Sequence, residues 1–337
     1  MKILVTGATS GLGRNAVEAL LREGHQVVAT GRNGDVGEQL QSAGAIFKAQ
    51  DLSHASIDDC RALLAGCDAV WHCAAKSSPW GSRREFWQAN VTATQTLVDA
   101  AVQSGVPRFV HISTPAVYFD FQHHHQLDEN YLAQRFACHY ASSKYAAEQA
   151  IAGAVPASPD TTFIILRPRG LFGPHDRVIV PRLLSQLQRD GGVLRLPRGG
   201  NARLDLTYVG NVVQAMQLAT TRPGLRSGRV YNVTNHEPQL LNEMLDALLA
   251  RQLGMRYRIQ PLPWPLVSVA ARGMELVGHL SSKEPSVTRY SVGTLGFDMT
   301  LSAARAIEEL GYRPAFSLEE GIALTGEWWR QQGIAHG

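Results

Sequence analysis

Several features that mark special classes of protein are scarce in this sequence. No apolar run approaches the roughly 18 residues that a membrane-spanning helix requires. The N-terminus begins directly with the strand-like residues Ile3-Leu4-Val5, without a basic segment followed by an apolar core, so no export signal is predicted. A net charge of +3 is too small to indicate nucleic-acid binding. We therefore expect a cytoplasmic protein without a nucleic-acid partner and without stable membrane insertion.

Metal-binding patterns are also lacking. The four cysteines, Cys60, Cys67, Cys73 and Cys138, show no paired metal-site spacing, and reduced structural thiols are expected. The run His123-His124-His125 is the alternative metal candidate. Adjacent histidines on an extended segment point in different directions, and no cysteine or acidic partner has useful spacing. We predict no metal site and interpret 123–125 as a flexible lid near the active site.

What the chain does contain is a regular alternation of short apolar segments with helical patterns. Strands are expected at 3–5, 27–29, 45–49, 69–71, 109–112 and 163–166, and helices between 12 and 24, from about 86 to 104, and through 140–151. Strands that are almost continuously apolar indicate a parallel sheet covered by helices on both faces. With 337 residues, of which 45% are hydrophobic, the chain suits one large or two interleaved domains.

A glycine-rich loop, Thr6-Gly7-Ala8-Thr9-Ser10-Gly11-Leu12-Gly13, separates the first strand from the first helix. Glycine lets a backbone turn tightly and approach a pyrophosphate, and the helix N-terminus offers free N–H groups to phosphate charge. Because strand, loop and helix follow in this order, we predict a dinucleotide site rather than a simple tight turn. The expected contacts in this loop are Gly7, Thr9, Ser10, Gly11, Leu12 and Gly13.

The pattern predicts an α/β fold, a Rossmann-type doubly wound parallel sheet with a smaller C-terminal substrate lobe. After Arg167-Pro168 the alternation breaks, and proline and glycine become frequent. Residues 1–168 are therefore the predicted nucleotide-binding domain. A segment near 205–235, with a strand at 231–233, is expected to return to the sheet, while 169–204 and 236–337 form the lobe.

The end of the second strand bears on the cofactor. An NAD enzyme usually has an acidic residue there to bind the adenosine ribose, but this chain has Gly31 followed by Arg32. A guanidinium can bind a 2′-phosphate through two hydrogen bonds, so NADP is predicted, with NAD as the alternative. Arg14 is a candidate to assist. Asp51, after the third strand, is an expected adenine contact, although it can instead cap the next helix.

Tyr140 and Lys144 stand four residues apart and therefore share one face of a helix. A nearby ammonium group is expected to lower the pKa of a tyrosine, so that Tyr140 exchanges a proton with a carbonyl or alcohol oxygen. Thr114 ends the fifth strand, and alternation favours it over Ser113 as the hydroxyl that holds the substrate oxygen. Asn90 is expected to hold a water linked to Lys144, with helix packing as the alternative.

These motifs resemble those of the extended short-chain dehydrogenase/reductase family over essentially the whole chain. The matches follow the family order: the glycine loop, Asp51-Leu52, His72-Cys73-Ala74-Ala75, Asn90-Val91, Ser113-Thr114, Tyr140 to Lys144, Arg167-Pro168 and Gly173-Pro174. The resemblance implies that Thr114, Tyr140 and Lys144 form a catalytic triad and that Lys144 also binds the nicotinamide ribose. The cofactor contacts that it implies also include Leu52, Ala74, Ala75, Lys76 and Pro168. Ser10 departs from the pattern, because extended members usually have glycine there.

The segments 75–81 and 207–212 resemble the branch that contains 3β-hydroxysteroid dehydrogenases and bacterial 2-alkyl-3-oxoalkanoate reductases. Sugar-nucleotide epimerases more often have aspartate at the position of Asn211. The resemblance implies a hydrophobic small-molecule substrate, steroid-like or 3-oxoacyl, and a homodimer. Ser78 and Trp80 join Thr114 and Tyr140 as expected substrate contacts, with a packing role as the alternative for Trp80.

The leading hypothesis is an NADP-dependent oxidoreductase, similar to 3β-hydroxysteroid dehydrogenases, that interconverts a ketone and a secondary alcohol. A sugar-nucleotide epimerase or dehydratase is the enzymatic alternative. A non-catalytic NADP-sensing protein is the alternative from another class, although Thr114, Tyr140 and Lys144 are all present.

Overall fold

Within the residues that the computed structural model describes, 1–177, 179–281 and 283–333, seven parallel strands form the central sheet. Their order across the sheet is β12 (Arg229–Val233), β7 (Thr162–Pro168), β5 (Arg108–Ile112), β4 (Ala69–His72), β1 (Lys2–Thr6), β2 (Gln26–Gly31) and β3 (Ile46–Ala49). Chain order runs outwards in both directions from β1, which pairs with β2 and β4. This reversal is the switch point of a doubly wound sheet, and the predicted Rossmann-type fold is confirmed.

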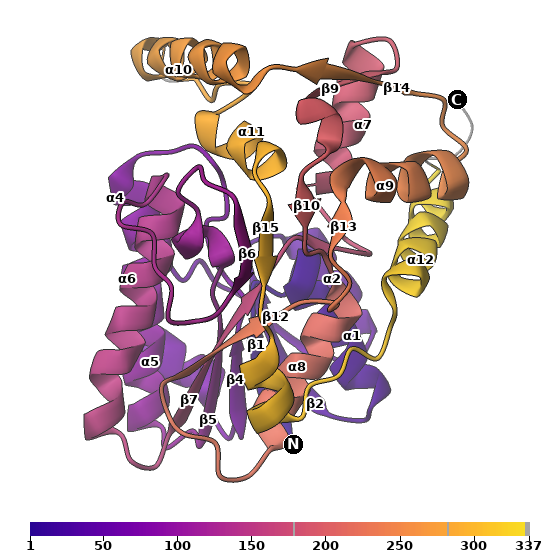
Figure 1. The fold of residues 1–337 in the computed structure, drawn as a ribbon. Coiled ribbons are helices and arrows are strands. Elements are labelled where there is room, and N and C mark those ends of the chain that lie inside the picture. Colours follow the sequence, from indigo (N-terminus) through magenta and orange to yellow (C-terminus); the bar gives the residue numbers. More distant parts are fainter. Residues whose placement is uncertain (178, 282, 334–337) are drawn as a thin grey trace.

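Both faces of the sheet are buried. In β1, Ile3 and Val5 point to one face and Leu4 to the other, as the alternation of a strand requires. Helices α1 (Gly11–Arg22), α2 (Gly34–Ser42) and α8 (Val209–Thr221) cover the first face, and α3 (Ile57–Leu64), α5 (Ala93–Gln103) and α6 (His139–Ala154) cover the second. Figure 1 shows α5 and α6 on one side of the strands and α1 and α8 on the other. The covered faces explain why the strand sequences are almost continuously apolar.

The expected returning strand is present, whereas the expected long helix is interrupted. Strand β12 pairs with β7 and aligns Tyr231 with Leu166, so it completes one edge of the sheet. The helix expected from about 86 to 104 is instead α4 (Arg83–Phe86), the π-helical segment η1 (Trp87–Thr92) and then α5. Such π segments often occur at functional sites, and this one carries the buried Asn90.

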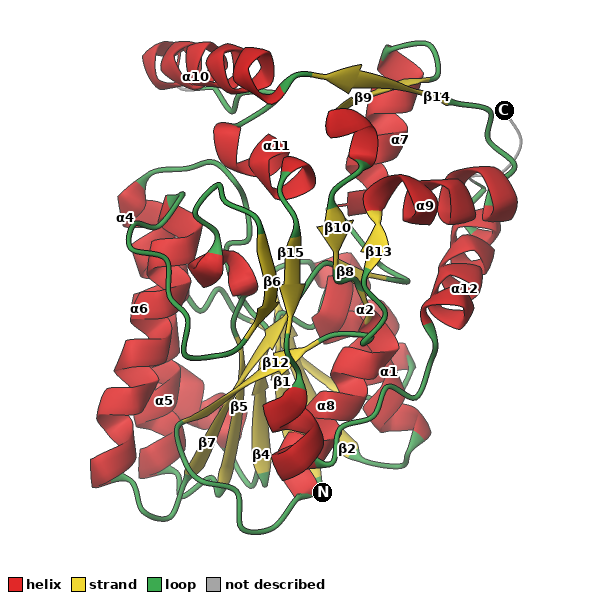
Figure 2. Cartoon of the chain, in the orientation of Figure 1, coloured by secondary structure: helices red, strands yellow, loops and turns green. Residues whose placement is uncertain are grey.

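A second apolar core lies beyond the carboxyl ends of the strands, towards the top of Figure 2. Its elements are α7 (Ile179–Arg189), β9 (Val193–Pro197), α9 (Leu241–Leu245), η5 (Asp246–Gln252) and α12 (Leu318–Gln331). Four short strands, β13 (Gln239–Leu240), β10 (Arg203–Leu204), β15 (Met299–Leu301) and β6 (His124–Leu127), form a small sheet there. Strand β14 (Arg258–Leu262) pairs with β9, and β8 (Leu171–Phe172) pairs with β11 (Thr207–Tyr208).

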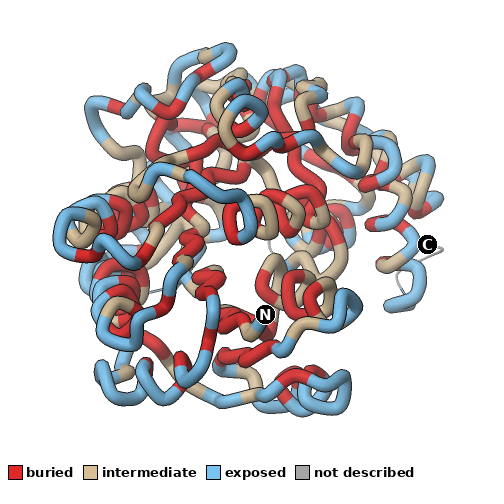
Figure 3. The backbone as a smooth tube through the Cα atoms, turned by 90° about the horizontal axis from the view of Figure 1, so that it is seen from below, coloured by how far each residue is buried: buried red, intermediate tan, exposed pale blue. Residues whose placement is uncertain are grey.

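The end of the chain contributes to both cores. Ala306 and Leu310 of η6 (Ala306–Leu310), together with Tyr312, pack against the first face of the large sheet, whereas Trp329 of α12 belongs to the second core. The boundaries at 168, 204 and 235 stay a prediction. In Figure 3 the buried segments gather in the interior and the exposed segments surround them.

The three consecutive histidines are part of ordered structure. His124 begins β6, which pairs with β15, and its Nε2 lies 2.9 Å from Asp120 Oδ1. The Asp298 backbone N–H donates to His123 Nδ1 at 3.0 Å. The expected flexible lid is therefore wrong, because strand pairing and aspartate contacts hold this segment. In the described part of the chain no group of His, Cys, Asp or Glu is arranged to hold a metal ion.

The remaining features agree with the composition. All four cysteines are unpaired, and burial raises the pKa of the Cys60 and Cys138 thiols to about 11 and that of Cys73 to about 12. Outside positions 178, 282 and 334–337, no helix combines the length and the hydropathy needed to cross a bilayer.

Candidate active site

A cavity of about 720 Å³ opens at the switch point, at the carboxyl ends of β1, β2, β4 and β5. The location is where ligands bind in sheets of this topology. Every predicted cofactor contact lines it: Gly7, Thr9, Ser10, Gly11, Leu12, Gly13, Arg32, Asp51, Leu52, Ala74, Ala75, Lys76, Tyr140, Lys144 and Pro168. Residues far apart in the sequence thus form one continuous wall.

The glycine loop needs glycine for steric reasons. Gly7 and Gly11 have φ angles of +65° and +50°, in the left-handed region. A Cβ atom on Gly13 would lie 2.2 Å from the Gly7 carbonyl oxygen, and one on Gly7 would lie 2.9 Å from the Ala74 backbone. Ser10 precedes α1 without a side-chain capping hydrogen bond. The loop is therefore a cradle of bare backbone at a helix N-terminus, which fits the pyrophosphate of a dinucleotide.

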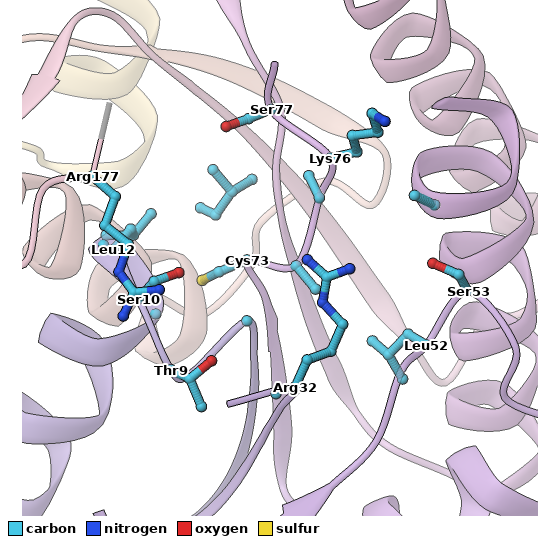
Figure 4. Close-up of a pocket in the computed structure, with 18 of the residues that line it drawn as sticks. Thr9, Ser10, Leu12, Arg32, Leu52, Ser53, Cys73, Lys76, Ser77 and Arg177 are labelled. Atoms are coloured by element: carbon cyan, nitrogen blue, oxygen red, sulfur yellow. The ribbon is translucent and has the colours of Figure 1, made fainter. Parts of the chain in front are cut away.

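Arg32 and Asp51 lie next to each other on the cavity wall. Although burial opposes it, hydrogen bonds from Ser53 and the charge of Arg32 hold the pKa of Asp51 below its ordinary value. Figure 4 shows Arg32 extending into the cavity between Cys73 and Leu52. The position agrees with a contact to the adenosine half of a dinucleotide.

A second arginine on this wall was not predicted. Arg177 lines the cavity, and in Figure 4 it lies beside Ser10 and Leu12. Its loop approaches the glycine loop, because the Gly11 N–H donates to the His175 carbonyl at 3.2 Å. Its place just after the Gly173-Pro174 turn is a signal that could have found it. Arg14, expected to assist, binds Glu18 and Gln39 and is not among the lining residues.

Other residues that line the cavity were not predicted as contacts, although Gly31, Cys73 and Ser113 stand within the motifs described above. They are Thr30, Gly31, Gln50, Ser53, His54, Cys73, Ser77, Glu85, Gln88, Ala89, Ile112, Ser113, Leu171, Asp176 and Ile179. Most are immediate neighbours of predicted contacts, so the strand ends that carry the motifs also bring these residues to the cavity.

Tyr140 lies at the catalytic end of the cavity, in the first turn of α6. Its hydroxyl is hydrogen-bonded to the side chain of Thr114. The neighbouring Ser113 hydroxyl instead donates to the buried carboxylate of Glu148. The two hydroxyls thus separate as strand alternation predicts, with Thr114 beside the tyrosine.

The Lys144 ammonium group contacts the end of β5 rather than the Tyr140 hydroxyl. Its Nζ donates to the Ile112 carbonyl at 2.6 Å and lies 3.1 Å from His111 Nε2. Burial lowers the pKa of Lys144 to about 8, and burial raises the pKa of Tyr140 to about 12. The expected lowering of the tyrosine pKa by Lys144 is not seen in this structure, in which Tyr140 is neutral near pH 7.

Asn90 does not line the cavity. Its Nδ2 donates to the Lys76 carbonyl at 3.1 Å and to Ser143 Oγ at 2.9 Å, and its Oδ1 accepts from the Lys76 N–H at 2.7 Å. Both amide protons are therefore committed to protein partners. These contacts support the packing alternative, in which Asn90 joins the Lys76 backbone to α6, and the water contact stays a prediction.

Ser78 and Trp80 are also absent from the cavity wall. Ser78 Oγ accepts a hydrogen bond from the Trp80 N–H at 3.2 Å. The Trp80 ring lies 4.4 Å, centroid to centroid, from that of His279 in α10 (Trp264–Ser281). The packing alternative therefore describes Trp80 better than the expected substrate contact.

Known proteins resemble this chain over nearly its full length. Over 335 residues, 99% of both chains, it is 47% identical to "Uncharacterized protein YbjS" from Escherichia coli strain K12. It is 34% identical to a 2-alkyl-3-oxoalkanoate reductase from Stenotrophomonas maltophilia, covering 96% of this chain and 97% of the relative. A 3β-hydroxysteroid-dehydrogenase/decarboxylase from Arabidopsis thaliana is 28% identical over 87% of this chain and 68% of its own.

Among solved structures, MoeE5 in complex with UDP-glucose and NAD superimposes with a TM-score of 0.76 at 25% identity, covering 98% of this chain and 99% of its own. The model of the NAD dependent epimerase/dehydratase family matches residues 3–234. The match includes the glycine loop, Tyr140 and Lys144, and it confirms the family resemblance that the motifs indicated. Family and relatives together indicate an NAD-dependent oxidoreductase, and the chain belongs to the NAD dependent epimerase/dehydratase family.

Proposed function

We propose that the chain is an NAD(P)-dependent oxidoreductase that interconverts a ketone and a secondary alcohol on a hydrophobic substrate. The observation that carries this proposal is the hydrogen-bonded pair Tyr140 and Thr114 at one end of the cavity, with the glycine cradle at the other. The carbonyl oxygen of a bound ketone can lie between the hydroxyl groups of Tyr140 and Thr114 and accept a hydrogen bond from each. A general acid must first lie within hydrogen-bonding distance of the oxygen that it protonates, and its pKa matters only after that condition is met.

The proposed chemistry balances with the residues present. A reduced nicotinamide, when bound, would supply a hydride to the carbonyl carbon, and the nicotinamide would thereby be oxidised. Tyr140 donates its proton to the carbonyl oxygen, so a secondary alcohol forms, and the phenolate regains a proton from solvent. Thr114 orients the oxygen. Lys144 lines the same cavity, where its ammonium group can bind a hydroxyl of the cofactor ribose.

An aromatic cluster in the second core, linked to Tyr140 through Tyr290, supports a hydrophobic substrate. It consists of Phe119, Phe121, Trp264, Tyr290 and Phe297, with ring centroids 4.9–6.3 Å apart in successive pairs. Tyr290, in α11 (Arg289–Gly296), is within electrostatic reach of Tyr140. The names of the reductase and steroid-dehydrogenase relatives support the same class of substrate.

The test is oxidation of NADPH and NADH by the purified protein with steroid ketones, 3-oxoacyl esters and aromatic aldehydes. We expect turnover with a ketone from one of the first two groups. UDP-glucose, titrated by calorimetry, tests the epimerase alternative that the likeness to MoeE5 supports. Binding of UDP-glucose without reduction of any ketone would overturn the proposal.

For the cofactor we propose NADP(H), bound by Arg32 at the 2′-phosphate. Arg32→Ala is expected to raise the Kd for NADPH about 10- to 100-fold, because a charge-assisted hydrogen bond contributes about 1.5–3 kcal/mol. The Kd for NADH is expected to change by less than about twofold, since that cofactor lacks the phosphate. Quenching of intrinsic fluorescence measures both constants.

Arg14→Ala is the matched control, because Arg14 binds Glu18 and Gln39 outside the cavity wall. It is expected to leave both constants unchanged. An equal loss of NADPH and NADH affinity in Arg32→Ala would contradict a specific phosphate contact.

A further inference from the structure

Arg169 carries a buried guanidinium in which two nitrogen atoms lack hydrogen-bond partners within the described chain. Among the described residues no group hydrogen-bonds its Nε or Nη2 atom, although both atoms are inaccessible to solvent. Its backbone, by contrast, is held at both ends. The N–H donates to the Val233 carbonyl at 3.2 Å, and the carbonyl accepts from Thr207 Oγ1 at 2.6 Å. Burying guanidinium N–H groups without hydrogen-bond acceptors costs free energy, and a bound ligand that accepts these hydrogen bonds would remove that cost.

Its place in the sheet puts this cation at the catalytic edge. Arg169 directly follows Pro168, the last residue of β7 and part of the cavity wall. Strands β5 and β7 are parallel neighbours and align Ile112 with Leu166. Continuing that register brings Arg169 one position beyond the level of Thr114 on the adjacent strand. The guanidinium therefore starts from the strand end next to the catalytic hydroxyls.

Tyr290 connects Arg169 to Tyr140. Burial raises the pKa of Tyr290 well above its ordinary value, Tyr140 adds to that rise, and Arg169 opposes it. The Tyr290 hydroxyl is thus within electrostatic reach of both Tyr140 and the guanidinium. Tyr290 also belongs to the aromatic cluster, through its contact with Phe119.

The nearby acid does not satisfy this cation. Asp205 is buried and in electrostatic contact with Arg169, but its Oδ2 accepts from the Leu301 N–H at 2.6 Å. No hydrogen bond joins Asp205 and Arg169 in the described part of the chain, as the unpartnered Nε and Nη2 show. Burial raises the pKa of Asp205 to about 6. Asp205 therefore offers charge at a distance, and the Nε and Nη2 atoms of Arg169 still lack a hydrogen-bond acceptor among the residues described.

We propose that Arg169 binds a carboxylate of the substrate, so that a free 3-oxo acid is a better substrate than its ester or a steroid ketone. The inference rests on the proposed function. A guanidinium pairs with a carboxylate through two parallel hydrogen bonds, as Nε and Nη2 allow. In a 3-oxo acid one carbon separates the carboxylate from the carbonyl carbon. Both groups can then be held around Tyr290, with the ketone oxygen at Tyr140 and the alkyl chain against the aromatic cluster.

The experiment compares 3-hydroxydecanoic acid with its methyl ester, oxidised with NADP⁺ or NAD⁺ by the wild type and Arg169→Met. Methionine keeps much of the volume and removes the charge. The wild type is expected to favour the acid, and Arg169→Met to lose about 10- to 100-fold in kcat/KM for the acid, mainly through KM. The ester is expected to change by less than about threefold. Arg203→Met is the matched control, since Arg203 is exposed and binds the Pro238 carbonyl.

Calorimetric titration of the acid into the holoenzyme gives a readout independent of turnover. Equal losses for acid and ester, or a wild type that oxidises the ester but ignores the acid, would overturn the inference and leave the proposed function intact. If neither compound reacts, the proposed function fails for 3-hydroxy acids and their esters. The titration then shows by itself whether Arg169 binds the carboxylate. Binding that vanishes in Arg169→Met supports the site, and unchanged or undetectable binding overturns it. Arg169→Lys, which keeps the charge, serves if the methionine variant does not fold, and it should retain part of the preference for the acid.

Discussion

Tyr140→Phe should lower kcat for ketone reduction about 10²- to 10⁴-fold, the usual contribution of a positioned proton donor. The substitution removes one oxygen atom from a buried ring, so the fold should tolerate it. Burial keeps Tyr140 neutral near pH 7, with a pKa of about 12, and Thr114 orients its hydroxyl. The variant therefore lacks the proton that the alkoxide must receive, while the glycine cradle at the other end of the cavity is untouched. Stopped-flow single turnovers measure the chemical step directly.

Tyr145→Phe is the matched control. Tyr145 lies in the same helix, is partly exposed and packs its ring against Phe136 at 5.4 Å. Its substitution should change kcat by less than about twofold. Cofactor affinity, followed by fluorescence, should be unchanged in Tyr145→Phe and should change far less than kcat in Tyr140→Phe, because the other cofactor contacts remain. A Tyr140→Phe enzyme that retains more than a tenth of the wild-type rate would remove Tyr140 from the proposed chemistry.

Arg167→Met should lower the free energy of unfolding by about 3–5 kcal/mol, because it leaves a carboxylate buried without its partner. Arg167 and Glu148 are joined by two hydrogen bonds, and their side chains are only 4% and 3% exposed. The same guanidinium donates to the Tyr118 hydroxyl at 2.7 Å, and Ser113 donates to Glu148. The network ties α6, which carries Tyr140, to the end of β7. Equilibrium unfolding in urea measures the loss.

Two further variants separate this network from ordinary charge effects. Arg61→Met breaks the exposed pair with Asp58 and should cost less than about 0.5 kcal/mol. The double variant Arg167→Met/Glu148→Met removes both buried charges and should recover part of the loss. The buried pair would not have the expected role if Arg167→Met lowered the free energy of unfolding by less than about 1 kcal/mol. The same holds if the loss in the double variant equalled the sum of two large losses in the single variants.

The parts of the fold that the sequence predicted are those in which local patterns and long-range packing agree. The apolar run at 3–5, the glycine loop and the first helix follow one another without a gap, and each has only one way to pack in a parallel sheet. Thr114 and Tyr140 were placed together because Thr114 follows the carboxyl end of the fifth strand, where the cofactor site was expected, and Tyr140 belongs to the helix that comes next in the predicted alternation. Strand periodicity was also enough to separate Thr114 from Ser113.

The failures have a common physical origin in tertiary contacts that no local pattern encodes. Periodicity shows an apolar helix face over 86–104, but it does not encode the π segment in which Asn90 is buried. His124 became a strand residue because β15, from 299–301, pairs with it. Arg169 and Tyr290 are separated by more than a hundred residues, and neither belongs to a motif. Their meeting beside Tyr140 follows from the packing of α11 against the segment after β5.

The return of β12 to the sheet has a consequence for biosynthesis. When residues 1–168 leave the ribosome, six strands of the sheet exist, but the outer edge of β7 is open until Val233 has been made. Part of the first face waits longer, because Leu310 and Tyr312 complete its core. An open edge beside an uncovered apolar face is the structure most prone to pair with another chain. The nascent protein is thus most vulnerable to aggregation during the second half of its own translation, when its nucleotide-binding half is made but not yet closed.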